Sequence, residues 1–145
     1  MTRSPAVPFK HRRSESVMSS DWKQTVTRVS GLAWMEDEAV VLQYRTRVTV
    51  TSGATSNLPQ TTESEVREHR VPLAALRSAR VVGGWWWPRI VLAAADLRAF
   101  DGFPVARGAG EELSLRISLG HRGDAADLAS SIELALANRL YLPPV

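Results

Sequence analysis

Histidine is the first residue type to examine for chemistry, because its imidazole serves as an acid–base catalyst and a metal ligand near neutral pH. The chain has three histidines: His11 in a basic stretch, His69 in a charged stretch and His121 beside a glycine. Their spacing forms neither an HxxxH nor an HExxH pattern, so a metal site would have to be assembled from distant segments. We interpret His121 as a surface residue of a turn and predict no metal site.

Nucleophilic catalysis has no recognisable motif either. The chain has no cysteine, which excludes a cysteine nucleophile, a disulfide framework and a thiolate zinc site. Serine, histidine and aspartate are all present, but no Gly-x-Ser-x-Gly elbow would position a nucleophile. Residues 108–112 (Gly-Ala-Gly-Glu-Glu) resemble a phosphate loop, yet they lack its lysine and precede a predicted strand, which favours a turn. We therefore predict a protein that is not an enzyme, with no catalytic residues and no cofactor.

Three consecutive tryptophans, Trp85, Trp86 and Trp87, form the most unusual stretch. Side chains alternate along an extended chain, so at least one indole should project away from the core. Tryptophan and arginine are enriched in interaction hot spots, and Arg80 and Arg89 flank the stretch, so we predict that these five residues bind a partner. Three interpretations stay open: indoles that plug the end of a barrel, a contact with a protein or a second copy, and a contact with a membrane interface.

The net charge of +3 is concentrated at the N-terminus. Residues 1–23 have five basic and two acidic side chains, which leaves 13 of each sign for residues 24–145. Residues 1–20 contain two prolines and five serines with almost no periodicity, so we predict a disordered basic tail followed by a single domain over residues 21–145. Because the predicted domain is neutral, we predict no nucleic-acid partner. The run Lys10-His11-Arg12-Arg13 could instead contact an anionic surface weakly.

Apolar stretches are short throughout the chain. The longest, residues 90–95, has six residues, far below the roughly 20 that a membrane span requires. The N-terminus also lacks the apolar core of a signal peptide. We expect a cytoplasmic protein.

Alternation of apolar and polar side chains dominates the rest of the sequence. It is most regular over residues 40–50 and 113–119, which predicts two strands with one wet face each. A charged turn at residues 36–38 and a polar connector at residues 51–62 flank the first of these strands. Shorter patterns indicate strands at 25–34 (with Gly31 as a bend or bulge), 63–71, 79–82 and 89–95, and a single helical turn at 72–76.

A C-terminal helix follows the last strand. Asp124 can cap it, and leucine or isoleucine recurs at helical spacing at positions 128, 132, 136 and 140. We expect the helix to pack on Leu113, Leu115, Ile117 and Leu119 in one core. Six or seven mostly hairpin-connected strands and one helix predict a mainly β (α+β) fold: a bent antiparallel sheet or partly open barrel capped by the helix.

This order of elements resembles the pleckstrin-homology-like (PH-like) superfold, in particular the small stand-alone bacterial PH-like proteins. The resemblance covers residues 22–141. It rests on residues 71–76 (Val-Pro-Leu-Ala-Ala-Leu) before a Gly-Gly hairpin, on residues 88–92 (Pro-Arg-Ile-Val-Leu) after it, and on the final strand and helix. Phosphoinositide-binding PH domains have basic residues around the first hairpin, where this chain has Glu36, Asp37 and Glu38, and they commonly have a tryptophan in the last helix, where this chain has none. Inositol phosphate binding is therefore not expected.

The resemblance implies a non-catalytic interaction module. We expect it to bind a protein partner or a second copy of itself, with pairing of sheet edges as a route to a dimer. Two alternatives stay open. The basic tail and the tryptophan-rich hairpin could bind an anionic membrane surface, or a barrel cavity could bind a small apolar ligand.

Overall fold

The structure is a computed structural model that describes residues 4–17, 22–53, 58–84, 86–104 and 112–141. Trp85, most of the turn predicted at residues 108–112 and the side chain of Leu140 lie outside the described residues. Within these ranges the chain forms β1 (Val7–Val17), β2 (Lys23–Glu36), β3 (Ala39–Ser52), β4 (Gln60–Glu63), β5 (Arg67–Pro72), the 3₁₀ turn η1 (Leu73–Ala75), β6 (Leu76–Val82), β7 (Arg89–Ala94), β8 (Glu112–Arg116), the 3₁₀ turn η2 (Leu119–His121) and the helix α1 (Arg122–Tyr141).

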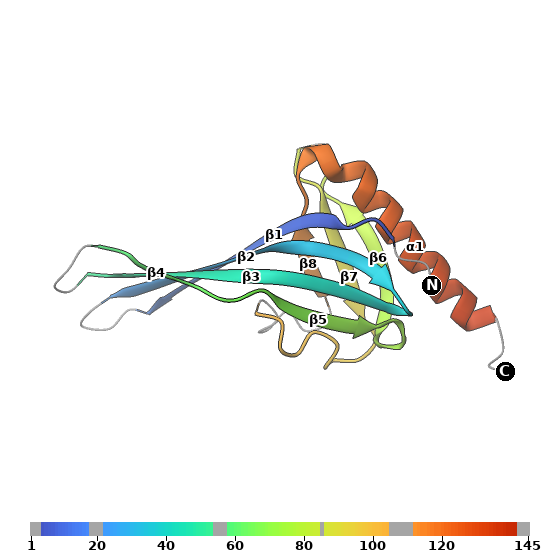
Figure 1. Ribbon diagram of the computed structural model, residues 1–145, viewed down its shortest axis with the longest axis horizontal. Coiled ribbons are helices and arrows are strands. Elements are labelled where there is room, and N and C mark those ends of the chain that lie inside the picture. The colour runs from blue at the N-terminus through green and yellow to red at the C-terminus, as the bar shows by residue number, and fades with distance from the viewer. Residues whose placement is uncertain (1–3, 18–21, 54–57, 85, 105–111, 142–145) are drawn as a thin grey trace.

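The strands form one bent antiparallel sheet. Its order is β4-β3-β2-β1-β8-β7-β6, and β5 lies beside β3. The half formed by β6, β7 and β8 stands against α1, whereas the far ends of β1, β2 and β3 run out past the helix together with β4 and form a projecting arm (Figure 1). The predicted mainly β fold with one C-terminal helix is confirmed, and the arrangement is consistent with a PH-like topology.

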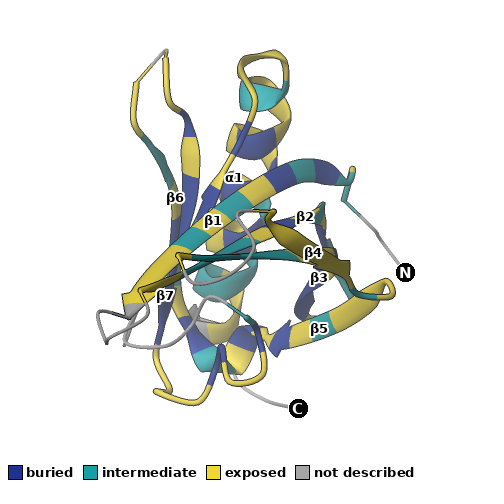
Figure 2. Cartoon of the chain, turned by 90° about the vertical axis from the view of Figure 1, so that its left-hand side faces the viewer, coloured by how far each residue is buried: buried dark blue, intermediate teal, exposed yellow. Residues whose placement is uncertain are grey.

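The core lies between the inner face of the sheet and α1 (Figure 2). The alternation predicted for the last strand is confirmed, because Leu113 and Leu115 belong to the same buried cluster as Leu128 and Ile132 of the helix. Leu119, which we expected to join them, is 55% exposed, because the chain leaves the sheet after Arg116 and turns through η2. No helix among the described residues is long and apolar enough to cross a membrane.

Aromatic rings close the side of the core that α1 does not cover. The segment after β7 carries Phe100 and Phe103, which are both buried. The Phe103 ring meets that of Tyr44 edge-on at 4.9 Å between centroids and lies 6.3 Å from that of Phe9. This segment is therefore part of the fold and not only a connection between strands.

The predicted disorder of the N-terminal tail is wrong for residues 7–17. They form β1, which pairs with β2 in a regular register from Val7 opposite Ala33 to Val17 opposite Lys23. Val7 and Phe9 are fully buried, so burial of two apolar side chains and a continuous ladder of backbone hydrogen bonds offset the entropy of ordering the strand. The basic residues that follow Phe9 therefore belong to the folded sheet.

Three boundaries also differ from the prediction. The strand expected over residues 63–71 is two strands, because β4 ends at Glu63 and β5 begins only at Arg67. Between them, the hydroxyl of Ser64 accepts a hydrogen bond from the backbone N–H of Thr46. The last three residues of the predicted polar connector, 60–62, belong to β4, which pairs with β3. The helix begins at Arg122, so Asp124 lies in its first turn and is not the cap.

The charged turn predicted at residues 36–38 is confirmed. Asp37 and Glu38 are both at positive φ in a two-residue hairpin loop between β2 and β3.

Gly31 is not at a bend or bulge. It lies in regular register between Phe9 of β1 and Tyr44 of β3. A Cβ atom at this position would lie 1.9 Å from the carbonyl oxygen of Gln43. Glycine is therefore required here because the neighbouring strand approaches too closely for any side chain.

We predict that Gly31→Ala lowers the free energy of unfolding by about 1–3 kcal/mol, because the backbone of β3 must move away. Gly120→Ala is the matched control, since a Cβ atom there would have nothing within 4 Å, and it should change stability by less than about 0.5 kcal/mol. Urea unfolding of the two variants measures both values. Equal stabilities would contradict the close approach of β2 and β3.

Candidate anion-binding face

Four of the five predicted partner-binding residues are described by the structure: Trp86 and Trp87 lie at the turn between β6 and β7, Arg80 lies on β6 and Arg89 lies on β7. Trp86 and Trp87 are 77% and 63% exposed, so at least two of the three indoles project outward, as alternation requires of at least one. Arg89 begins β7 and is exposed. Arg80 is different, because it forms an ion pair with Glu112 at 3.2 Å between nitrogen and oxygen. The two arginines therefore differ: Arg80 has a carboxylate partner, whereas no ion pair joins Arg89 to a carboxylate among the described residues.

The strand register assembles a first row of charges across four strands. Arg12 of β1 is opposite Arg28 of β2, which is opposite Arg47 of β3, which is opposite Glu63 of β4. Residues in register point to the same side of a sheet. Phe9 and Val29 are an odd number of residues from Arg12 and Arg28 along their strands, so they point to the opposite side, and both are buried in the core. This row therefore lies on the outer side.

A second row lies two residues away along each of these strands, on the same side of the sheet. It runs from Arg45 of β3 through Ser30 of β2 to Lys10 of β1. Lys10 is the β1 residue that pairs with β8, where it meets Arg116, and Arg116 is opposite Arg89 of β7. The second row therefore crosses five strands and ends two residues from Trp87.

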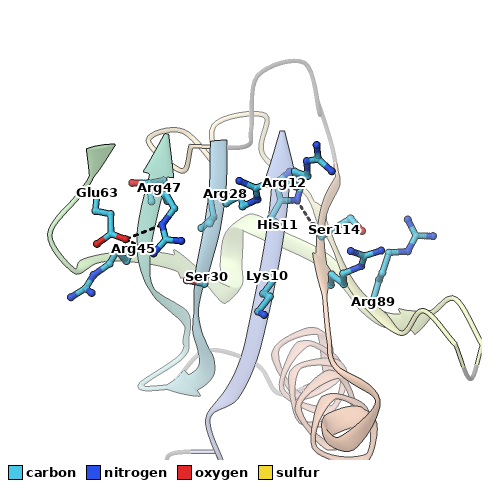
Figure 3. A pocket seen from close by; sticks show the side chains of 13 residues that line it. Lys10, His11, Arg12, Arg28, Ser30, Arg45, Arg47, Glu63, Arg89 and Ser114 are labelled. Carbon is cyan, nitrogen blue, oxygen red and sulfur yellow. Dashed lines mark hydrogen bonds and ion pairs between the residues drawn. The ribbon is translucent and has the colours of Figure 1, made fainter. Parts of the chain in front are cut away.

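We call the outward side chains of these rows the basic face, which comprises Lys10, Arg12, Arg28, Arg45, Arg47, Arg89 and Arg116. They line a surface hollow of about 960 Å³, together with Ser30, Ser114 and Glu63 (Figure 3). All seven basic residues are exposed. The face thus combines a concave shape with seven cations and a single carboxylate.

Most of this charge has no counter-ion within the described part of the chain. Arg47 is the exception, since its Nε atom donates to Glu63 at 2.8 Å. No ion pair joins any of the other six basic residues to a carboxylate among the described residues. Like charges directly opposite each other on neighbouring strands are destabilising, so this arrangement works against folding. It leaves a strong positive potential in the hollow.

Arg116 connects the basic face to the exposed Trp86 and Trp87, which we call the tryptophan turn. Its guanidinium carbon lies 5.1 Å from the centre of the Trp87 ring, a cation–π contact. Trp87 as a whole residue is 63% exposed, so the contact with Arg116 does not bury it. Aromatic surface and cationic charge therefore adjoin at this end of the hollow.

Each of the three histidine rings lies within hydrogen-bond distance of an oxygen atom of the protein. His11 Nδ1 lies 3.1 Å from the carbonyl oxygen of Ser114 and so links β1 to β8 beyond their pairing at Lys10. His69 Nε2 lies 3.2 Å from the carbonyl oxygen of Ala99, and His121 Nδ1 lies 3.4 Å from a carboxylate oxygen of Asp124. The described residues contain no group of three or more histidine, cysteine, aspartate or glutamate side chains that could hold a metal ion.

Sequence reasoning identified Arg89 but missed most of the basic face. Arg45 and Arg47 alternate on the polar side of the predicted strand at 40–50, and Lys10 and Arg12 have the same spacing. That spacing is a signal for a one-sided basic strand. The balanced charge of residues 24–145 concealed it, because several carboxylates (Glu36, Glu38, Glu68 and Glu112) pair with arginines elsewhere. We predicted no nucleic-acid partner because the predicted domain is neutral. The structure shows a basic face on the folded part of the chain, so this reason no longer holds.

Comparisons with protein-family models, with curated proteins and with solved structures find no match to this chain. Its function therefore has to be argued from the geometry and charge of the basic face.

We predict that Arg28→Thr raises the free energy of unfolding by about 0.5–1 kcal/mol at low salt, because Arg28 lies between Arg12 and Arg47 in the first row. Salt screens this repulsion, so the gain should shrink as ionic strength rises. Urea unfolding at low and high salt measures the effect.

Arg67→Thr is the matched control, an exposed strand arginine outside both rows, and it should give no gain. A loss of stability in Arg28→Thr, or a gain that does not depend on salt, would contradict repulsion within the row.

Proposed function

We propose that this protein is a non-catalytic binding module whose basic face binds a polyanion. One observation carries the proposal: two adjacent rows of cations surround a hollow, and six of the seven have no carboxylate partner among the described residues. Rows of like charge cost stability in the free protein, and an anionic partner removes that cost when it binds. The basic N-terminal segment and the hairpin region, which formed our alternative hypothesis of an anionic-surface contact, both contribute residues to this one face.

The composition of the face supports a phosphate-rich partner. Six of the seven cations are arginines. Their planar guanidinium groups match phosphate oxygens in a bidentate geometry that lysine cannot reproduce. Their spacing of about 4.8 Å between adjacent strands allows neighbouring guanidinium groups to bind successive anionic groups of one partner.

A protein partner is a second candidate, favoured by the exposure of Trp86 and Trp87. Exposed indoles beside an arginine are typical of binding hot spots. A partner of this kind would use the turn between β6 and β7 and would not depend on Arg12, Arg28 or Arg45. Binding of a small apolar ligand inside the sheet has less support, because Phe9, Tyr44 and Phe103 pack together in the core.

Heparin is a general polyanion that tests the proposal. We expect salt-sensitive binding, and we expect the triple variant Arg12→Ser/Arg28→Ser/Arg45→Ser to lose at least about tenfold in affinity and roughly two to three units of the slope of log K against log salt. Isothermal titration of heparin at several salt concentrations measures both quantities.

The control removes the same charge elsewhere, as Arg67→Ser/Arg98→Ser/Arg139→Ser, three exposed arginines outside the basic face. If this control weakens binding as much as the triple variant of the face, net charge and not the face governs binding, and the proposal fails. Absence of heparin binding by the unaltered chain would also overturn it.

A further inference from the structure

We infer that the polyanion is single-stranded nucleic acid, with its phosphates on the basic face and its bases stacked on Trp86 and Trp87. The inference rests on the proposed function, because it names the partner of the same face. It adds one feature, the tryptophan turn, that a purely electrostatic contact does not use.

The dimensions of the face fit a short stretch of a single strand. The second row crosses from β3 to β7, four steps of about 4.8 Å, or roughly 19 Å in all. With a rise of about 3.4 Å for each stacked nucleotide, that distance corresponds to about five or six nucleotides. The row ends beside Trp87, so a strand that follows the cations reaches the indoles at the end of its path.

The tryptophan turn supplies what a single strand needs beyond charge. Bases stack on exposed aromatic side chains whatever their sequence, because every base has a π-face. Trp87 is held on one side by Arg116 and remains mostly exposed, and Trp86 is more exposed still. In a duplex the base faces are already stacked on one another, so two exposed indoles favour unpaired bases.

A lipid surface fits the same face less well. Of the residues that line the hollow and that the structure describes, only Val29 is apolar, and it is buried. The hollow lies on the outer side of the sheet, and its lining residues come from β4, β3, β2, β1, β8 and β7 (Figure 3). A peripheral membrane site inserts apolar side chains beside its cations, and the hollow itself has no exposed apolar side chain among the described residues.

The polar groups of the hollow predict little sequence preference. Its neutral side chains include Ser30 and Ser114, whose short hydroxyls can bond to a phosphate or to any base edge. The remaining contacts are to phosphate and to the faces of the bases. We therefore expect binding that depends on strandedness and salt more than on base identity.

Fluorescence anisotropy with a labelled oligothymidylate of roughly twelve nucleotides tests the inference, since that length exceeds what the face covers. We expect the unaltered chain to bind it, and Trp86→Ala/Trp87→Ala to bind it at least about tenfold more weakly. The same variant should bind heparin within about twofold of the unaltered chain, because heparin has no bases to stack.

Two further variants separate stacking from damage to the fold. Trp86→Phe/Trp87→Phe keeps aromatic surface and should retain most of the affinity for the oligonucleotide. Trp22→Ala removes an exposed indole next to β2 and should leave that affinity unchanged. Equal affinity of Trp86→Ala/Trp87→Ala and the unaltered chain for the oligonucleotide would overturn the stacking role and, with it, the inference.

The other occupants of the face are outcomes of the same experiment. Tighter binding of a duplex of the same length, or arginine-dependent binding to phosphatidylcholine–phosphatidylglycerol vesicles without binding to the oligonucleotide, overturns the inference. Heparin binding without oligonucleotide binding also overturns it but leaves the proposed function intact. Failure to bind heparin, the oligonucleotide and the vesicles overturns both.

Discussion

The pairing of β1 between β2 and β8 is the interaction on which the rest of this structure depends. On one side β1 forms a long regular ladder with β2, and on the other it meets β8 through Lys10 and Arg116 and through His11 and Ser114. Without it, the edges of β2 and β8 would lose their shared neighbour, and the two halves of the sheet would have no strand in common. β1 therefore joins the two halves into a single sheet.

The same strand joins the core to the surface that we propose for binding. Its alternation sends Val7 and Phe9 inward, where they are buried, and Lys10 and Arg12 outward into the two rows of cations. The inner side chains stabilise the sheet, and the outer ones bring like charges together at a cost in stability. The buried inner side chains hold the strand in a fixed place, and a partner of negative charge would offset the repulsion on the outer side.

The sequence predicted those elements whose patterns are local. Val40, Leu42 and Tyr44 recur at every second position, Asp37 and Glu38 follow a strand end, and Leu128 and Ile132 recur at helical spacing. Each pattern corresponds to the observed element, although Val41, on the other side of β3, is also buried. The strand β1 was missed because only Val7 and Phe9 carry its apolar alternation before a polar run that resembles a disordered tail. The basic face was missed for a different reason. Whether Arg12, Arg28 and Arg47 lie side by side depends on the register between strands, and local periodicity does not specify that register.

Amide hydrogen exchange of the N-terminal segment tests the central claim most directly. If β1 is an integral strand of the sheet, peptides that cover residues 7–13 are protected in the free protein to a degree comparable with peptides from the paired part of β2. The experiment needs no ligand, so its result does not depend on the identity of the polyanion. Exchange of residues 7–13 at the rate of an unstructured chain would contradict the account, because Lys10 and Arg12 would then have no fixed place beside Arg28, Arg45 and Arg47.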